Sequence, residues 1–189
     1  MNDFEIINES NEGNLFLRKI SKTDSRFVFN SLNQEGMVNY LSLGPLKTLE
    51  YSKRLIRSYL KLWDDFIQFN YIIEIRNANQ IRIGSISLWN VNWRHRRAEI
   101  GIWIIPSYWN KGFGKISIEL IKNIGFNHLK LNRLEAHMAV ENKRSISLFK
   151  QCGFEVEGTL KKYLNFEGHY YDALILSCLR ANLYLKKIE

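Results

Sequence analysis

The feature that most constrains the fold is an apolar run at residues 98–105, which is followed by a polar turn and then by a helical pattern. At strand spacing both faces of this run are apolar apart from Glu99, which is typical of a strand inside a sheet. Pro106 ends the strand because proline has no N–H to donate to a neighbour. After the turn at residues 110–115, apolar residues recur at helical spacing, at Ile116, Leu120, Ile121 and Ile124. The chain is therefore predicted to pass from a central strand into a helix.

The turn itself has features of an anion-binding loop. Gly112 and Gly114 precede the helical pattern, and the first N–H groups of a helix lie at the positive end of its dipole. The turn lacks the GxxxxGK[ST] and GxGxxG motifs. A nest of amides without a magnesium ligand suits a pyrophosphate that is esterified at both ends, such as that of coenzyme A. Lys111 and Lys115 add positive charge. A tight connection without a ligand is the alternative for this glycine pair.

Composition indicates one domain that spans residues 1–189, with its core at about 13–181. The chain is 46% hydrophobic, which is enough to bury a core at this length. The first residues show no secretory signal pattern, and no apolar run approaches the roughly 18 residues of a membrane span. Cys152 and Cys178 have no CxxC motif or histidine cluster beside them, so reduced thiols and no metal site are expected. These features predict a cytoplasmic protein with no membrane partner.

The net charge of +8 indicates either an anionic partner or many solvated lysines. The densest basic run is Arg-His-Arg-Arg at residues 94–97. We interpret it as an exposed loop between two strands, with contact to a phosphate-rich ligand or an acidic protein surface as the alternatives. No aromatic RNA-binding motif or recognition-helix pattern accompanies it, so nucleic acid is not the expected partner.

The remaining patterns predict an α+β fold with a mixed, mostly antiparallel sheet of about seven strands and about four flanking helices. Thr48 is a predicted N-cap, and so is Thr23 or Asp24. Gly153 is predicted to end the last helix in the left-handed conformation, with Phe154 packing back on its final turn. The other expected strands are residues 15–20, 71–76, 81–89, 133–140, 156–164 and 170–179, and the last expected helix is residues 145–151.

The order and spacing of several segments resemble the GCN5-related N-acetyltransferases (GNAT), specifically the RimJ/RimL branch, which includes ribosomal-protein-alanine N-acetyltransferases. The similarity runs from about residue 15 to residue 179. Its segments are LFLRKISKTD, TLEYSKRLI, AEIGIWIIPSYWNKGFG, LNRLEAHMAVENKRSISLFKQCGFEVEGTLKKYL and EGHYYDALILSCL. Gly112 and Gly114 match the small positions of the family's (Q/R)xxGx(G/A) loop. Trp109 stands where Gln or Arg is common, as is typical of the RimJ/RimL branch.

The resemblance implies a single GNAT domain in which two central strands splay apart and hold acetyl-CoA as the co-substrate. Residues 133–140 would form the wall opposite the central strand. The pantetheine arm would meet the backbone of Trp103, Ile104 and Ile105, and the pyrophosphate would bind the amides of Lys111, Gly112, Phe113, Gly114, Lys115 and Ile116. Direct transfer in a ternary complex is expected, because no motif supports a cysteine nucleophile.

Acetyl transfer to an amine needs a neutral amine, a polarised thioester and a proton for the departing thiolate. Asn142 and Ser145 match the family's NxxS motif, which implies that Asn142 contacts the cofactor and that the Ser145 hydroxyl protonates the thiolate. In the alternative, Asn142 caps a helix and Ser145 lies in its first turn. Many relatives carry a tyrosine four residues after this serine, but this chain has Phe149, which cannot donate a proton. The difference weakens the analogy with spermidine acetyltransferases, which carry that tyrosine.

Glu99 is the first candidate for the general base, because it is the one acid on the buried strand near the expected thioester. The alternative is a structural carboxylate paired with Arg97 or with a helix end. Glu135 and His137 share a face of the next strand and are weaker candidates, since a lone strand histidine is more often structural. Glu167 is a further candidate, although a solvated loop carboxylate is the simpler interpretation.

The expected acceptor is a primary amine, with a protein N-terminal α-amine of the ribosomal-protein kind as the first choice. Neutralising an α-amine costs about 1 kcal/mol at pH 7, against roughly 4–5 kcal/mol for a lysine-like or polyamine-like amine. The alternatives are a polyamine, an amino sugar or an antibiotic and, outside enzymes, a module that binds CoA or nucleic acid. The acceptor is expected near residues 33–45 and 165–170, and the relatives also allow a homodimer.

Overall fold

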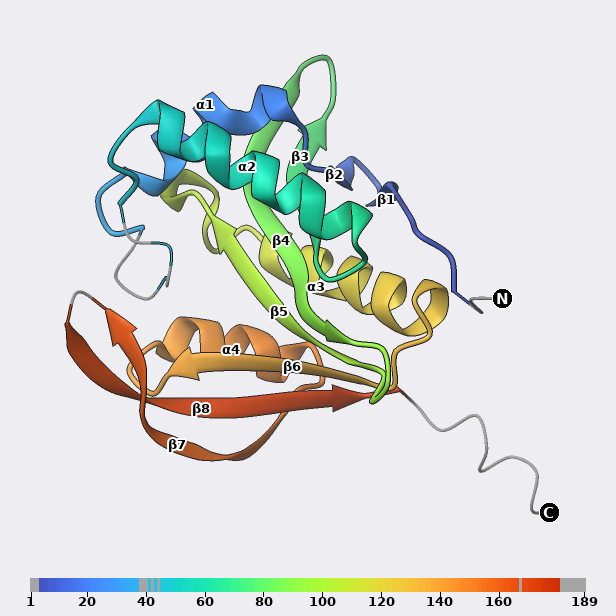
Figure 1. Cartoon of the computed structure of the whole chain (residues 1–189), viewed down its shortest axis with the longest axis vertical. Helices are drawn as coiled ribbons and strands as arrows, with labels where there is room; N and C mark the ends of the chain where they lie inside the picture. The colour runs from blue at the N-terminus through green and yellow to red at the C-terminus, as the bar shows by residue number, and fades with distance from the viewer. Residues whose placement is uncertain (1–3, 38–40, 42, 44, 167, 181–189) are drawn as a thin grey trace.

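The computed structural model describes residues 4–37, 41, 43, 45–166 and 168–180, which contain eight strands and four α-helices (Figure 1). In chain order the elements are β1 (Glu9–Glu12), β2 (Leu15–Lys19), α1 (Ser25–Leu32), α2 (Leu49–Asp64), β3 (Phe69–Arg76), β4 (Gln80–Asn92), β5 (Arg97–Ile104), α3 (Phe113–Asn123), β6 (Arg133–Ala139), α4 (Lys143–Gln151), β7 (Glu155–Phe166) and β8 (His169–Leu179). No described helix is long and apolar enough to cross a membrane.

The strands form one open sheet in the order β1-β2-β3-β4-β5-β6-β8-β7. All neighbours are antiparallel except β5 and β6, which are parallel. The predicted mixed, mostly antiparallel α+β sheet is therefore confirmed. The strand beyond the expected seven is β1, whose sequence ESNE is polar throughout. It has no apolar alternation that could mark it as a strand.

The sheet divides at β5 and β6. In the described part of the chain these strands pair only over Arg97–Glu99 and Arg133–Glu135. Both strands continue beyond that point, β5 to Ile104 and β6 to Ala139, and they diverge (Figure 1). The predicted splay of the central strands is confirmed, and it leaves a gap between two half-sheets.

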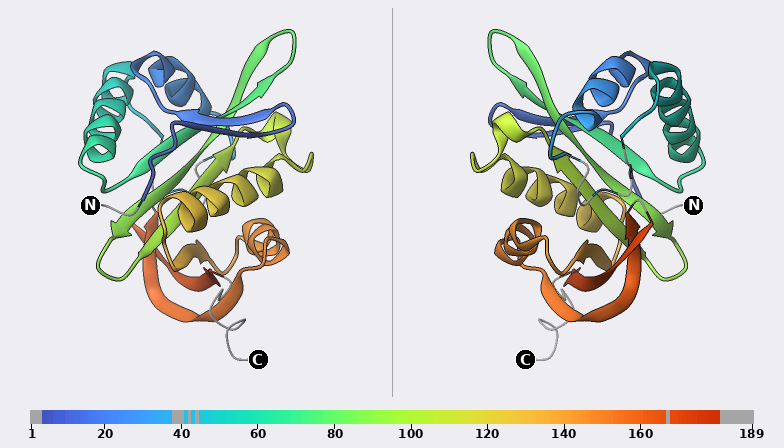
Figure 2. Two further views of the ribbon diagram at one scale, coloured as in Figure 1. Left: turned by 90° about the vertical axis from the view of Figure 1, so that its right-hand side faces the viewer. Right: turned by 90° about the vertical axis from the view of Figure 1, so that its left-hand side faces the viewer.

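Helices cover both faces of the sheet: α1 and α2 lie on one side, and α3 and α4 lie on the other (Figure 2). Alternate residues of the central strands therefore enter two different cores. Tyr71 and Ile73 pack in the core that contains α3, whereas Ile72 packs in the core beneath α1 and α2. Burial on both faces explains why the central strands are apolar in nearly every position.

Most of the predicted helix ends are present. Thr48 Oγ1 accepts a hydrogen bond from the Tyr51 N–H at 3.1 Å, so this N-cap is confirmed. Gly153 has a φ of 81°, and the Phe154 N–H donates to the Phe149 carbonyl at 3.1 Å. The helix after the glycine turn begins at Phe113 and not after residue 115, so Gly114 and Lys115 lie in its first turn.

Asp24, one of the two predicted N-cap residues, does occupy the N-cap position of α1, at the end of a 3₁₀ turn formed by Lys22–Asp24, but its carboxylate makes no capping hydrogen bond to that helix. This carboxylate is fully buried and instead receives the Arg18 guanidinium, with an N–O distance of 2.7 Å. A buried charge requires a partner of opposite charge, which Arg18 supplies, and the carboxylate also accepts the Ser21 N–H at 2.8 Å.

Candidate functional site

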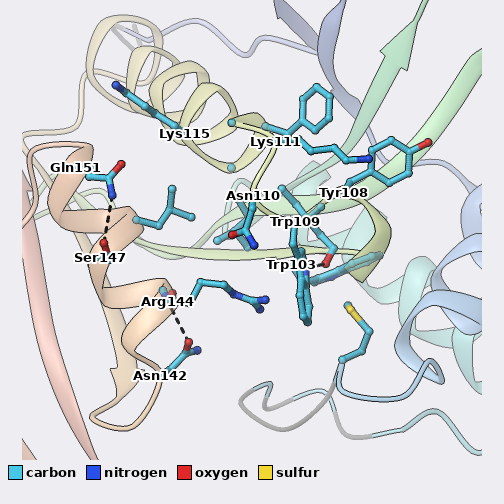
Figure 3. Close-up of a pocket in the computed structure, with 18 of the residues that line it drawn as sticks. Trp103, Tyr108, Trp109, Asn110, Lys111, Lys115, Asn142, Arg144, Ser147 and Gln151 are labelled. Atoms are coloured by element: carbon cyan, nitrogen blue, oxygen red, sulfur yellow. Dashed lines mark hydrogen bonds between the residues drawn. The ribbon is translucent and has the colours of Figure 1, made fainter.

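Two cavities open where β5 and β6 separate. The larger cavity, of about 570 Å³, lies between the end of β5, the start of α3 and α4 (Figure 3). The smaller cavity, of about 350 Å³, is lined by α1, α2 and the strands β3 to β6. The cavities meet, because five described residues line both of them: Leu41, Ile102, Trp103, Asn142 and Ser145.

The start of α3 forms one end of the larger cavity. Gly112 is the N-cap residue of α3, and its φ of 83° lies in the left-handed region. The space around it is open, because a Cβ at this position would meet no atom within 4 Å. Glycine is therefore favoured here by backbone conformation and not by lack of space. The N–H groups of Phe113, Gly114 and Lys115, which all line the cavity, belong to the first helical turn and have no acceptor within the helix. These amides and the helix dipole make this end of the cavity suitable for an anion.

Gly114 has a different role from Gly112. A Cβ at Gly114 would lie 2.9 Å from Cδ2 of Leu148 on α4. The missing side chain lets Leu148 of α4 approach the backbone of α3 closely, and both residues line the larger cavity. One glycine thus sets the conformation of the loop and the other sets the packing of the helix.

The charge of the larger cavity is positive. Its described lining contains Lys111, Lys115 and Arg144 and no carboxylate. The Arg144 guanidinium stacks on the Trp109 ring, 3.4 Å from the ring centroid, and the Trp109 indole N–H donates to the Ile104 carbonyl (Figure 3). Burial lowers the pKa of Arg144, but an arginine keeps its charge at neutral pH. An anionic ligand in this cavity would therefore have the first-turn N–H groups of α3 as hydrogen-bond donors and positively charged side chains around it.

Nine of the eleven residues predicted to contact the cofactor line this cavity: Trp103, Ile104, Lys111, Gly112, Phe113, Gly114, Lys115, Asn142 and Ser145. The other two do not. The Ile105 N–H donates to the Ile83 carbonyl at 2.8 Å, and the Ile116 N–H donates to the Gly112 carbonyl at 3.2 Å. Sequence reasoning missed the cavity residues Tyr108, Asn110, Arg144, Leu148 and Gln151. Of these, Arg144 could have been predicted, because it lies between Asn142 and Ser145 in the ENKRS segment that matches the family's NxxS motif.

Ser145 lies where the two cavities meet. Asn142 is the N-cap of α4, and its Oδ1 accepts the Ser145 N–H at 3.2 Å. The alternative prediction, in which Asn142 caps the helix and Ser145 lies in its first turn, is therefore present in the fold. The Ser145 hydroxyl itself has no hydrogen-bond partner in the described part of the chain. Capping of the helix thus places a free hydroxyl on the boundary between the cavities.

Glu99 lies in the smaller cavity and is only 4% exposed. Its Oε2 is 3.0 Å from His137 Nδ1, and its Oε1 accepts from Asn90 Nδ2 at 2.7 Å. Burial is the largest influence on the pKa of Glu99 and acts to raise it. The hydrogen bonds from His137 and Asn90, with the positive charge of Arg97, outweigh burial, so the pKa lies below its usual value. Glu99 is therefore an ionised carboxylate at neutral pH.

The expected partner Arg97 binds elsewhere. Its Nη1 donates to Glu135 Oε2 at 3.1 Å, and Glu135 also receives Arg133. With both oxygens occupied, Glu135 is a structural carboxylate. Glu167, the other acid considered, lies outside the described residues.

Sequence reasoning missed Asn90, the second partner of Glu99. It has a φ of 51° and lies at a break in the β4–β5 register between Trp89 and Asn92. The available signal was an asparagine inside an apolar strand, because asparagine tolerates the left-handed conformation better than most residues. The rest of the smaller cavity is mostly apolar and aromatic, and it includes Val28, Leu32, Leu55, Tyr59, Trp89 and Phe149.

Neither cysteine belongs to the described lining of the cavities, and both are free thiols. Burial raises the pKa of Cys152 to about 11, so it is a protonated thiol at neutral pH and a weak nucleophile. Among the described residues, no group of three or more His, Cys, Asp or Glu side chains is placed to hold a metal ion.

Comparison with known proteins gives a consistent result. A sequence model of the acetyltransferase (GNAT) domain matches residues 14–155. The uncharacterized N-acetyltransferase YoaA of Bacillus subtilis is 30% identical over 166 residues, which cover 88% of this chain and 93% of that protein. The crystal structure of spermidine N-acetyltransferase from Vibrio cholerae in complex with CoA and spermine is 29% identical, with a TM-score of 0.79, and covers 89% of this chain and 96% of that chain. RimL, a ribosomal L7/L12 alpha-N-protein acetyltransferase in complex with coenzyme A, has a TM-score of 0.82 at 18% identity over 89% of this chain and 95% of its own, a likeness of fold alone.

Proposed function

This chain belongs to the GNAT family of N-acetyltransferases, which use acetyl-CoA as co-substrate, and we propose that it acetylates the α-amine of a peptide or protein N-terminus. We also propose that it lies in the RimJ/RimL branch. The acceptor assignment rests on the smaller cavity, whose described lining is mostly apolar and aromatic and contains one carboxylate, Glu99, beside uncharged polar residues such as Asn70 and Ser87.

The larger cavity fits acetyl-CoA. The first-turn amides of α3 offer donors to a pyrophosphate, and Lys111, Lys115 and Arg144 surround them with positive charge. The backbone of Trp103 and Ile104, where β5 still pairs with β4 but no longer with β6, is proposed to bind the pantetheine arm. When bound, acetyl-CoA supplies an acetyl group activated as a thioester. Ser145, at the boundary of the cavities, is proposed to protonate the departing sulfur.

The smaller cavity fits one amine next to an apolar group. An amine drawn to Glu99 would place its neighbouring side chain against Leu32, Tyr59 or Trp89. A polyamine carries further positive charges, and the described lining of this cavity offers no second carboxylate to receive them. An α-amine is also the easier nucleophile, because its neutral form costs about 1 kcal/mol at pH 7 against roughly 4–5 kcal/mol for an alkylamine.

A small polyamine is the second candidate. It is favoured by relatives named as spermidine N(1)-acetyltransferases, one of which, from Vibrio cholerae, is 29% identical over 93% of this chain. Phe149 lines the smaller cavity and is 2% exposed. Having no hydroxyl, it leaves proton donation to Ser145 for either acceptor.

The test is turnover of acetyl-CoA with a matched set of acceptors. It would use a short peptide with an apolar first residue, the same peptide blocked at its N-terminus, spermidine and an amino sugar. We expect kcat/KM for the free peptide to exceed that for spermidine at least 10-fold, and no acetylation of the blocked peptide. A preference for spermidine would overturn the α-amine assignment. Acetyl-CoA at 100 times its Kd should stabilise the protein by about 2.7 kcal/mol, and no stabilisation would overturn the assignment of the larger cavity.

A further inference from the structure

The smaller cavity contains a buried nitrogen with no hydrogen-bond partner in the described part of the chain, Nε2 of His137. The imidazole is held at its other nitrogen, where Nδ1 lies 3.0 Å from Glu99 Oε2. The two side chains are 11% and 6% exposed, so water competes little with this contact. His137 is therefore fixed in orientation, with one end bound and the other end unsatisfied.

The partner at Nδ1 determines the state of Nε2. An ionised carboxylate can only accept a hydrogen bond, so Nδ1 must carry the proton. In the neutral imidazole, Nε2 then has a free lone pair. A buried polar atom without a partner is uncommon and calls for an explanation, of which a bound substrate is one.

We propose that Nε2 of His137 is the general base that takes the proton from the acceptor amine, and that Glu99 is a positioning residue that sets its tautomer. This proposal rests on the proposed function and names the proton acceptor of the same site. Glu99 is the poorer base of the two, because each of its oxygens already accepts a hydrogen bond, from His137 and from Asn90. Those bonds favour its ionised form. An imidazole is the side chain best suited to exchange protons near neutral pH.

The neighbours of the ring leave Nε2 without a hydrogen-bond partner in the described part of the chain. From β7, Tyr163 packs edge-on against the imidazole, with ring centroids 5.3 Å apart. On β8 the residue opposite His137 is the apolar Ile175. On β6 itself, Glu135 is held by Arg97 and Arg133. Among the described residues, the charged group in contact with the ring is therefore Glu99 on β5.

The proton balance of the reaction is complete with these groups. The bound ammonium gives one proton to the Nε2 lone pair and becomes a neutral amine. Its nitrogen lone pair forms the C–N bond to the acetyl carbon, and the C–S electron pair leaves with sulfur. The second N–H proton is lost to solvent as sulfur takes a proton from Ser145, whose hydroxyl is restored from solvent. The imidazolium of His137 then returns its proton to solvent.

His137→Asn tests the proposal, because the asparagine amide can still donate to Glu99 but has no basic nitrogen. With an α-amine peptide at pH 7, we expect kcat/KM to fall by roughly 10²–10⁴-fold, with the Kd of CoA unchanged. The loss should shrink as pH rises above the pKa of the amine, because solution then supplies neutral amine. The matched control is His95→Asn, an exposed histidine in the β4–β5 turn, which should keep the wild-type rate and pH profile.

A purely structural histidine would behave differently, since its replacement would lower kcat/KM by the same factor at every pH. Either that result or a wild-type rate for His137→Asn would overturn the proposal. Imidazole ¹⁵N NMR gives a second readout that needs no turnover. The expected spectrum shows Nδ1 protonated and Nε2 unprotonated in the neutral ring, and an Nε2–H tautomer would overturn the proposal. Failure of the wild-type protein to acetylate any amine would instead count against the proposed function.

Discussion

The two cavities are built in different ways. The larger cavity presents backbone N–H groups and surrounding cations that come mainly from one segment, residues 103–115, with α4 beside it. The smaller cavity depends on side chains from separate strands, such as Asn90 on β4, Glu99 on β5 and His137 on β6. A site made of backbone N–H groups is specified by nearby residues, through the glycines of the loop and the position at which the helix begins. A site made of side chains exists only when distant strands are in register.

Ser145 lines both cavities, so among the variants discussed below its replacement is expected to have the largest effect. Ser145→Ala removes a hydroxyl that no described group engages, and it should leave α4 capped by Asn142. We expect kcat to fall by about 10²-fold or more, with little change in the Kd of CoA. Steady-state kinetics and calorimetry would measure the two quantities. Ser58→Ala, an exposed serine on α2, is the control, and an equal loss in both variants would contradict the role of Ser145.

Glu99→Gln tests how far the smaller cavity depends on charge. The glutamine oxygen can accept a hydrogen bond from His137 or from Asn90, but not from both, and the glutamine NH₂ group then faces the remaining donor. We therefore expect the free energy of unfolding at pH 7 to fall by about 1–3 kcal/mol. Because the folded pKa of Glu99 lies below the usual 4.5, its contribution is fully present above that pH. The contribution is lost as pH falls through the lower folded pKa.

The difference in unfolding free energy between the wild type and Glu99→Gln should therefore shrink below about pH 4.5. Urea unfolding at a series of pH values measures it. The exposed Glu12→Gln should show no such dependence. A difference that stays constant down to pH 3 would show that charge does not stabilise this site.

Gly112→Ala tests whether the larger cavity depends on the backbone. Alanine in the left-handed region costs about 1–2 kcal/mol, and we expect the Kd of CoA to rise by up to about 10-fold. Gly13→Ala is a close match, because Gly13 has a φ of 57° and equally open space but lies between β1 and β2, away from both cavities. It should lose similar stability and keep the wild-type Kd. Equal weakening of CoA binding in both variants would rule out a local role for Gly112.

The smallest effect is expected from Trp109→Phe. This change removes the indole N–H that donates to the Ile104 carbonyl and keeps a ring beneath Arg144. A lost neutral hydrogen bond is worth about 0.5–1.5 kcal/mol, so the Kd of CoA should change only a few-fold. Trp89→Phe, in the smaller cavity, should leave that Kd unaltered and raise the KM of the acceptor. The opposite pattern would mean that the two cavities have been assigned the wrong ligands.

The fold could be predicted largely because its signals are local. Apolar alternation, the Thr48 cap and the left-handed Gly153 each act over a few residues, and all appear in the structure. The exceptions also have physical reasons. Strand β1 is too short and polar to show a pattern, and the buried carboxylate of Asp24, at the N-cap of α1, binds Arg18 and the Ser21 N–H in place of the first amides of that helix.

The sequence alone was enough to determine the strand–turn–helix segment and its glycine loop, because conformational preference and helix polarity are properties of neighbouring residues. It also determined that Ser145 follows a capping asparagine. Only the tertiary structure decided that Glu99 binds His137 and Asn90 in place of Arg97, and that Ser145 lies between two cavities. Those contacts depend on the short parallel pairing of β5 with β6 and on a bulge in β4. Such register is set by packing across the whole sheet, so no single stretch of sequence contains it.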